Sequence, residues 1–572
     1  MKRIKLNLLA LLSVAAIVLS SCGVSKMKEL TEDTKITLDP NPLEVHGGVV
    51  KGKIEATFPS KYFNKKAILE ITPVLVYEGG ELPLPAKMLQ GEDVEDNHQV
   101  IKKDAGGSAS HEFEFEYTDE MMDSELELRF VIIHKGDRIP FDEPEKIGVG
   151  VIATSQMVEL DPKPSECTHK FQRIVSEDEE AQINFVIQRS NIRKSELTKD
   201  DINALQEFIA KTSDEESRLE LKGINVSAYA SPDGPIDLNE KLSNERGENT
   251  QKWLADIFKE SDVEADTEEF VSVETTTEDW EGFKEKVQAS DIQDKELILR
   301  VLSMYSDPEV REKEIKNLSK VYLVLAEKIL PELRRSKMTA NVDRIGYSDE
   351  EFNEMVENDN LDELNLEEML YAGNLVEDMD AKLNIYTKAA EKFNDVRAHN
   401  NLAYANLKKD NVDAAKAALE AATAIDANNA KVKNNMGCVE LIEGNVEEAE
   451  NLFVGAANAG PEVKYNLGII SIINNKYPAA VEYLGGTDSF NQGLAMLLTD
   501  KNDAAKNTFE KVEEPKAYYG QAIVGARIGD ENMVLNNLRT AIGEDASLKE
   551  RAKKDLEFRN YFQNDAFMAI VE

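Results

Sequence analysis

Residues 401–422, NLAYANLKKDNVDAAKAALEAA, and residues 435–456, NMGCVELIEGNVEEAENLFVGA, decide the fold of the C-terminal part of the chain. The second stretch begins 34 residues after the first and has small or apolar residues at matching places. These places are Ala403, Ala415, Leu419 and Ala422 in the first stretch, and Gly437, Ala449, Phe453 and Ala456 in the second. Because a fixed period of this length is typical of stacked helical hairpins, the pattern predicts an array of helix pairs.

This period and its small residues resemble the tetratricopeptide repeat. Three later sets at shorter spacing continue it: Gly468, Ala480 and Leu484, then Gly493, Ala505 and Phe509, then Ala522, Leu538 and Ala541. We therefore predict an all-α tetratricopeptide-repeat solenoid over residues 361–570, in which small residues let the two helices of a unit touch and Phe453 and Phe509 fill the gaps between neighbours.

Stacked hairpins form a concave groove, so the resemblance implies a protein partner held on the repeats as an extended peptide or a helix. Four polar residues on the predicted first helices are candidates for lining the groove: Asn434, Asn435, Tyr465 and Asn466. A solvated polar face explains these four residues equally well.

The N-terminus carries an export signal. Basic residues at positions 2, 3 and 5 precede an apolar run at 8–19, which is shorter than the ~20 residues that a membrane helix needs. The run ends in Leu-Ser-Ser before Cys22, which resembles the lipobox cut by the lipoprotein signal peptidase. We expect a signal peptide over residues 1–21 and acyl chains on Cys22 that anchor the protein to the outer membrane. Residues 23–26 lack the acidic side chains typical of surface-exported lipoproteins, which favours a body that faces the periplasm.

Residues 35–165 follow a short linker at 22–34 and have the pattern of a β-sandwich. Short strand-like runs alternate with glycine turns, such as Gly106-Gly107. In residues 111–117, HEFEFEY, aromatic residues alternate with glutamates, as in a strand with one buried face. The number of strands favours an immunoglobulin-like topology.

Residues 170–347 change to strands that alternate with amphipathic helices, which predicts a central α+β domain. Residues 239–246, NEKLSNER, resemble the N-x-x-L-S-x-x-R signature of the OmpA-like peptidoglycan-binding domain. Gly234 also stands where that family has its loop glycine. The resemblance implies an OmpA-like fold, here with a helical insertion at about residues 280–329, and a site for the diaminopimelate of peptidoglycan.

The candidate peptidoglycan-binding residues are Ser231, Asp233, Asn239 and Arg246. Arg246 matches the family's ligand-binding arginine, whereas Ser231 stands in place of its aspartate. Serine can form a hydrogen bond with the ligand's ammonium group but cannot neutralise it. Asp233 and Asp237 are close enough in sequence to substitute. The alternative is that Asn239 and Arg246 only fasten the loop to the helix.

Composition and motifs exclude several classes of protein. The 109 acidic residues outnumber the 67 basic ones, and the net charge of −42 repels nucleic-acid backbones. Besides Cys22 the chain has only Cys167 and Cys438, in different predicted domains, so no disulfide framework is expected. The sequence has no paired-carboxylate, nucleophile, phosphate-loop or metal motif, so we expect no enzyme, cofactor or metal.

Two functions remain open. The leading one is a non-catalytic outer-membrane lipoprotein scaffold that holds protein partners on its repeats and contacts peptidoglycan through its central domain. The alternative is a surface lipoprotein that captures glycans or nutrients, as SusD-like proteins built on tetratricopeptide repeats do. Such sites stack sugars on aromatic side chains, and the 2 Trp and 7% aromatic content of this chain disfavour that function.

Overall fold

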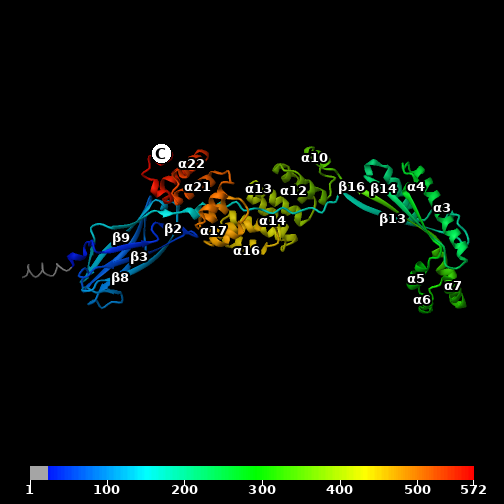
Figure 1. Ribbon diagram of the computed structural model, residues 1–572, viewed down its shortest axis with the longest axis horizontal. Coiled ribbons are helices and arrows are strands. Elements are labelled where there is room, and N and C mark those ends of the chain that lie inside the picture. Colours follow the sequence, from blue (N-terminus) through cyan, green and yellow to red (C-terminus); the bar gives the residue numbers. More distant parts are fainter. Residues whose placement is uncertain (1–23) are drawn as a thin grey trace, which may run out of the picture. The chain divides into compact units, whose positions relative to one another are not determined.

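The computed structural model describes residues 24–572, so Cys22 and the predicted signal peptide lie outside the described residues. The chain divides into two compact units. Unit 1 comprises the residues up to Thr168 together with Asp378–Glu572, and unit 2 is His169–Glu377. The N-terminal strands and the C-terminal helices therefore belong to one unit, although unit 2 lies between them in the sequence (Figure 1).

Unit 1 begins with two sheets that share one hydrophobic core. The five-stranded sheet has the order β1-β3-β2-β12 with β8 on β3, and the seven-stranded sheet has the order β10-β9-β4-β6-β7 with β11 on β9 and β5 on β4. The strands are β1 Lys35–Asp39, β2 Leu43–His46, β3 Val49–Phe58, β4 Ala67–Tyr77, β5 Gly80–Pro83, β6 Lys87–Gly91, β7 Gln99–Ile101, β8 Gly107–Glu116, β9 Ser124–His134, β10 Asp137–Pro140, β11 Glu145–Val149 and β12 Val151–Ile152. The predicted sheet-rich N-terminal region is confirmed, and the immunoglobulin-like topology stays a prediction.

The sequence of β8 determines which face of this strand is buried in the core and which is exposed. Phe113 and Phe115 are buried, whereas Glu112 and Glu114 are exposed, as the alternation predicts. The turn before β8 requires glycine at position 106, because its φ is +70° and a Cβ there would lie 2.3 Å from the carbonyl oxygen of Phe58.

Part of the predicted linker at 22–34 packs on this core. Met27, in the short helix η1 Ser25–Met27, is fully buried in it, and the hydroxyl of Tyr62 donates a hydrogen bond to its carbonyl at 3.3 Å. The folded region therefore begins earlier than residue 35.

The C-terminal part of unit 1 is a stack of helix pairs. The helices are α12 Met379–Lys392, α13 Val396–Lys408, α14 Val412–Ile425, α15 Ala430–Ile442, α16 Val446–Gly455, α17 Glu462–Ile473, α18 Tyr477–Tyr483, α19 Phe490–Leu497, α20 Asn502–Phe509, α21 Pro515–Ile528, α22 Glu531–Glu544, α23 Leu548–Lys554, η6 Leu556–Tyr561 and α24 Asp565–Val571. A Cβ on Gly437 would lie 2.6 Å from Cε1 of Phe453, and one on Gly493 would lie 2.4 Å from Cε1 of Phe509. The small residues therefore let the two helices of a pair touch, as predicted. Phe453 and Phe509 fill space within a pair, and Phe509 also packs on Gly520 of the next pair, where an added Cβ would lie 2.6 Å from its Cζ.

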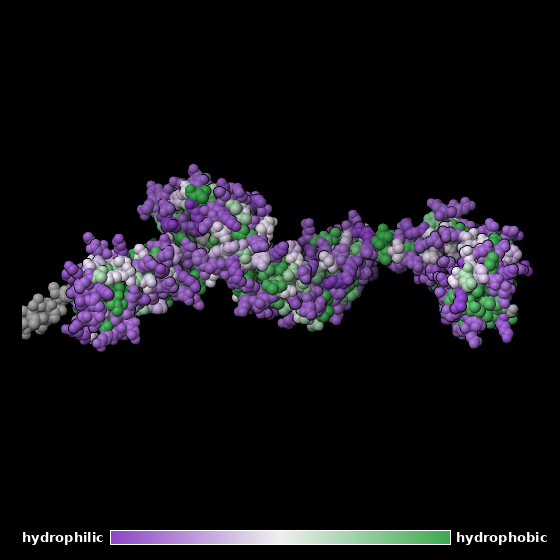
Figure 2. Space-filling view, turned by 60° about the horizontal axis from the view of Figure 1, so that its bottom comes forward, coloured by the Kyte–Doolittle hydropathy of each residue, from purple (hydrophilic) through white to green (hydrophobic). Residues whose placement is uncertain are grey.

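Unit 2 is built on a four-stranded sheet of order β13-β16-β14-β15, in which β15 is parallel to β14. Its elements are β13 Ile174–Asn184, α2 Asp200–Ala210, β14 Leu219–Tyr229, α3 Ile236–Glu260, α4 Thr267–Phe270, β15 Val271–Thr276 and β16 Arg335–Ile345. The predicted helical insertion consists of α5 Trp280–Ala289, α6 Lys295–Met304, α7 Pro308–Asn317, α8 Ser319–Lys328 and α9 Leu330–Leu333, and has a core of its own. Hydrophilic side chains cover most of the visible surface of the chain (Figure 2).

The borders between the parts differ from the expected ones. Two helices, α10 Asp349–Glu357 and α11 Leu366–Leu375, belong to unit 2, because Phe171 packs on Phe352 and Tyr371 with ring centroids 5.4 and 4.7 Å apart. The repeats of unit 1 therefore begin at α12 and not at residue 361. The last strand of the sandwich ends at residue 152, and the chain beyond it crosses to the repeats. Among the described residues, no helix is both long and apolar enough to cross a membrane.

Candidate functional site

The groove of the repeats is occupied by the chain itself. Residues 158–168, named the linker here, have no regular secondary structure and run along the first helices of successive repeats, α19, α17, α15 and α13 (Figure 1). A backbone without a neighbouring strand or helical turn needs other partners for its N–H and C=O groups once it is buried. These partners are side chains of the repeats.

Four asparagine side chains, named the asparagine ladder here, bind the linker backbone in the same way. Asn491 binds Glu159, Asn466 binds Lys163, Asn435 binds Ser165 and Asn401 binds Cys167. In each pair, Oδ1 of the asparagine accepts a hydrogen bond from the linker N–H at 2.6–2.9 Å. Its Nδ2 donates to the C=O of the same linker residue at 2.9–3.0 Å. Each ladder asparagine therefore contacts the linker as an adjacent β-strand would.

Two further asparagines support the ladder from the preceding positions. Asn400 donates to the carbonyl of Ser165, and Asn434 donates to the carbonyl of Lys163, both at 3.0 Å. Asn400 also accepts a hydrogen bond from Asn435 at 3.1 Å. All six asparagines are fully buried, so each depends on these partners for its hydrogen bonds.

The ladder follows the register of the repeats. Each of its residues stands two positions before the small residue of a first helix: Asn401 before Ala403, Asn435 before Gly437, Asn466 before Gly468 and Asn491 before Gly493. In the last set this position is Gly520, and the ladder ends there. Comparing the sets at this one position would have found Asn401 and Asn491, which sequence reasoning missed.

Side chains of the linker are also bound. The Glu166 carboxylate lies 3.1 Å from the Lys382 ammonium and accepts a hydrogen bond from the hydroxyl of Tyr386, while Lys431 donates to the Glu166 carbonyl at 2.6 Å. The hydroxyl of Tyr465 donates to the carboxylate of Asp161, with O–O distances of 2.7 and 2.9 Å. The Glu159 carboxylate lies 3.2 Å from the Lys516 ammonium, so the linker is held through its backbone and through three of its carboxylates.

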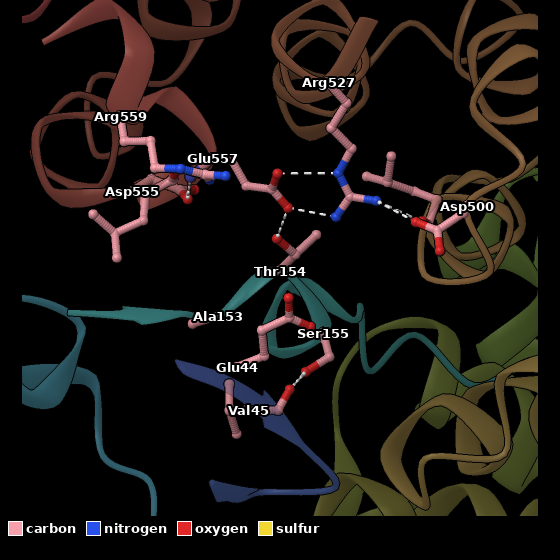
Figure 3. Close-up of polar contacts among 12 residues, drawn as sticks. Glu44, Val45, Ala153, Thr154, Ser155, Asp500, Arg527, Asp555, Glu557 and Arg559 are labelled. Carbon is pink, nitrogen blue, oxygen red and sulfur yellow. Dashed lines mark hydrogen bonds and ion pairs between the residues drawn. The ribbon is translucent and has the colours of Figure 1, made fainter. Parts of the chain in front are cut away.

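A polar network fastens residues 153–155, which come just before the linker, to the end of the repeats (Figure 3). The Thr154 hydroxyl donates to Oε1 of Glu557 at 2.7 Å, and the same carboxylate accepts hydrogen bonds from Arg527 (Figure 3). Arg551 donates to the carbonyl of Ala153 at 2.8 Å, and the Ser155 hydroxyl donates to the carbonyl of Val45 at 2.7 Å. Because Val45 lies in β2 and Glu557 in η6, this network joins the sheets to the last repeat.

Cys167 is enclosed at the far end of the groove. Its side chain is 5% exposed, and burial raises the pKa of its thiol to about 11. Asn401 holds its backbone from both sides, so the thiol reports on whether the linker is docked. Within residues 24–572, no three His, Cys, Asp or Glu side chains are grouped so that they could hold a metal ion.

The four candidate peptidoglycan-binding residues lie together in unit 2. They share the lining of a small cavity of about 30 Å³ with Arg334. Asp233 accepts a hydrogen bond from Ser231 and pairs with Nη2 of Arg334 at 3.0 Å, and Nδ2 of Asn239 donates to the carbonyl of Gly234 at 3.1 Å.

Arg246 is directed at backbone carbonyls. Its guanidinium donates to the carbonyl of Arg189 at 3.1 and 3.2 Å and to the carbonyl of Tyr229 at 2.8 Å. The side chain is 1% exposed, and burial together with the neighbouring Arg334 lowers the pKa of Arg246 to about 10. This geometry favours the alternative in which Asn239 and Arg246 fasten the loop to the helix.

Comparison with known proteins bears on the repeats. The family model of the tetratricopeptide repeat matches residues 396–429. No curated protein matches this chain. The helix pair α13 and α14 is thus a tetratricopeptide repeat.

Solved structures are similar to about a third of the chain. YrrB, described as a tetratricopeptide-repeat protein with an unusual peptide-binding site, is 23% identical, and the match covers 30% of this chain and 97% of that one with a TM-score of 0.25. PilF of Pseudomonas aeruginosa is 18% identical, with 37% of this chain and 97% of that one covered and a TM-score of 0.27. PilW, described as a widely conserved type IV pilus biogenesis factor, is 15% identical, with 34% and 92% covered and a TM-score of 0.26.

Proposed function

We propose that this chain is a non-catalytic scaffold whose tetratricopeptide repeats bind extended protein segments, beginning with its own linker. The asparagine ladder carries this proposal. An array of buried amides that pairs with both the N–H and the C=O of residues 159, 163, 165 and 167 suits an extended polypeptide, and it has no evident use for a small molecule. Tyr465, Asn466, Asn434 and Asn435 line the groove, and the first segment that they hold belongs to the same chain.

Self-binding explains how the scaffold is assembled. The linker leaves the sandwich at residue 157, crosses the repeats and continues into unit 2 at His169. When the linker is docked in the groove, its hydrogen bonds hold the sandwich on the repeats, although unit 2 separates the two in the sequence. Two chain connections join unit 2 to unit 1, at residues 168–169 and 377–378. In this scaffold the repeats are an internal brace as well as a surface for partners.

Limited proteolysis of the purified full chain tests the proposal. A glutamate-specific protease has target bonds after Glu159 and Glu166 inside the linker, and we expect both to resist cleavage while exposed acidic loops are cut. A chain with Asn401, Asn435 and Asn466 all changed to alanine should be cut in the linker first. Equal cleavage of the two proteins in the linker would contradict the proposal.

The lipid anchor is a second part of the proposal. Acylation of Cys22 would hold the scaffold on the outer membrane, facing the periplasm, and the lipobox is the observation that supports it. We expect a Cys22→Ser chain to move from the membrane fraction to the soluble fraction. Fractionation with protease treatment of intact and opened cells would then show which face the body occupies.

Peptidoglycan contact through unit 2 is the third part, and it rests on the signature at residues 239–246. Because Arg246 is buried, its substitution would disturb folding as well as binding. Asp237 is exposed and close to the candidate site, so Asp237→Asn is a better probe, with the equally exposed Glu240→Gln as its control. Co-sedimentation of the full chain with cell-wall sacculi should be weakened by the first change only. A full chain that does not co-sediment would leave unit 2 as a protein-docking domain.

A further inference from the structure

The linker sequence has a pattern that matches the ladder. The ladder binds residues 159, 163, 165 and 167, which all have odd numbers, while Pro162 and Pro164 stand at even positions. Proline has no backbone N–H, so it can occupy only positions whose N–H the groove does not bind. Over residues 162–167 the prolines therefore alternate with the residues that the asparagine ladder binds, as expected for an extended chain with a period of two residues.

From this register we infer that the groove is a receptor for a class of peptide: extended, acidic segments with prolines at alternate positions. We infer further that such a segment of a partner protein can replace the linker. The inference rests on the proposed function and names the chemistry of the partner. Backbone recognition tolerates many sequences, so selectivity must come from the side chains that the groove also contacts.

Two contacts select carboxylates. The Lys382 ammonium and the Tyr386 hydroxyl meet the carboxylate of Glu166, and both of these side chains are buried. A neutral residue at the place of Glu166 would lose its ion pair with Lys382 and its hydrogen bond with Tyr386, so it should bind more weakly. The hydroxyl of Tyr465 and Nδ2 of Asn491 meet the carboxylate of Asp161.

A third contact selects a small residue. Ser165 is 1% exposed, and its hydroxyl lies 3.1 Å from Nδ2 of Asn434 and 3.4 Å from the Glu462 carboxylate. A larger side chain has no room there. The chemistry that the groove accepts is thus an acidic residue, then proline, any residue, proline, a small hydroxyl residue and a second acidic residue, as in residues 161–166.

Covalent attachment of the linker determines what occupies the groove when no partner protein is bound. The linker is covalently attached at both ends, which gives it an effective concentration in the millimolar range at its own groove. A free peptide with the same contacts cannot compete at micromolar concentration. A partner protein can compete only if it makes contacts beyond the groove. The linker therefore excludes weakly binding segments from the groove, and it also holds the sandwich on the repeats.

Fluorescence anisotropy with a synthetic peptide of residues 157–169 tests this inference. The receptor is the full chain in which residues 159–167 are replaced by glycine and serine at equal length. We expect the peptide to bind this receptor at least ~100-fold more tightly than the unaltered chain, whose groove is filled. A peptide with Lys163→Pro should bind ~10-fold or more weakly, because the N–H bound by Asn466 is lost and the buried amide oxygen has no donor. Leu160→Pro is the matched control, because Leu160 is 51% exposed at an even position, and should stay within ~3-fold of the parent.

Equal losses for the Lys163→Pro and Leu160→Pro peptides would overturn the register. Absence of binding to a receptor that keeps the circular-dichroism spectrum of the unaltered chain would overturn replacement by a partner. If the linker of the unaltered chain nevertheless resists proteolysis, the proposed binding of the linker by the repeats is still supported. Should the replaced receptor not fold, the same two proline substitutions are made in the linker of the full chain. Cleavage after Glu166 must then rise for Lys163→Pro and not for Leu160→Pro.

Discussion

The side-chain amide of asparagine carries a donor and an acceptor side by side, so one residue can bind both the N–H and the C=O of a peptide unit. In this chain four such amides replace the neighbouring strand that the linker lacks. The net value of each hydrogen bond is modest, but an unsatisfied group left in the buried groove is costly. Loss of one ladder residue should therefore destabilise unit 1 more than loss of an exposed asparagine.

Asn435→Ala is the clearest single substitution. It removes the partners of the Ser165 N–H and leaves Asn400 Oδ1 without its donor. We expect the free energy of unfolding to fall by about 2 kcal/mol in urea titrations followed by circular dichroism. Asn451→Ala, at an exposed position of α16, is the control and should change it by less than about 0.5 kcal/mol. Equal effects of the two substitutions would count against the ladder.

The thiol of Cys167 gives a second test at this scale. Burial raises its pKa from 9.0 to about 11, so the folded state favours the protonated thiol. At pH 9 about half of an ordinary thiol is ionised, against about 1% of a thiol with this pKa. We expect Cys167 to react slowly with a thiol reagent at pH 9 in a Cys22→Ser chain, and quickly after the Asn401→Ala substitution.

The same shift has a consequence for stability. The contribution of the buried thiol is complete below pH 9 and is lost as the pH rises through about 11. Cys438 is the internal control for the labelling, because it is fully buried in the repeat core and should stay unreactive in both proteins. Fast labelling of Cys167 in the unaltered chain would mean that the linker is not docked.

Some residues of the groove could be predicted from the sequence, but the segment that they bind could not. Asn434, Asn435, Tyr465 and Asn466 were placed on the groove, because helix position follows from the repeat period. Their occupant could not be found in this way, since the ladder pairs with backbone atoms and leaves little trace in the linker sequence. Arg246 shows the opposite case, because its match to a family motif did not reveal that carbonyls of Arg189 and Tyr229 take its donors.

At the scale of elements, the pairing of helices was predictable because small residues recur where two helices cross. Gly437 leaves room for the ring of Phe453. The borders of the repeats were less predictable, since α11 has a helical pattern like theirs but packs with Phe171 in unit 2. Which neighbour a helix chooses depends on tertiary contacts that its own sequence does not contain.

A pair of glycine substitutions tests this packing. Gly437→Ala would force a Cβ to within 2.6 Å of Phe453, so we expect the free energy of unfolding to fall by about 1–3 kcal/mol from overpacking. Gly543→Ala, in α22, meets nothing within 4 Å and should raise it by up to about 1 kcal/mol through helix propensity. Urea denaturation measures both, and a stabilising Gly437→Ala would contradict the packing.

At the scale of the whole molecule, unit 1 is made from two segments that unit 2 separates in the sequence. Composition and periodicity describe each segment but do not show that they meet. Their union depends on scattered contacts, such as Thr154 with Glu557 and His46 with Tyr477, whose Nδ1 and hydroxyl lie 2.9 Å apart. None of these pairs belongs to a sequence motif.

The Thr154→Val substitution probes this union. Thr154 is buried, and valine keeps its shape but loses the hydroxyl that donates to Glu557. We expect the free energy of unfolding of unit 1 to fall by about 1–2 kcal/mol. Thr57→Val, at an exposed place in β3, is the matched control and should have little effect. If the two substitutions are equivalent in urea titrations, the network of Figure 3 does not join the sheets to the repeats.

Hydrogen–deuterium exchange of the linker in the intact chain tests the central claim most directly. The amides of Glu159, Lys163, Ser165 and Cys167 should exchange at least about a thousandfold more slowly than in an unstructured chain, and the Asn401→Ala and Asn435→Ala substitutions should remove much of this protection. The Asn451→Ala chain should keep it. Exchange of the linker within seconds in the unaltered protein would contradict the account, because the groove would then be open and its asparagines would hold something else.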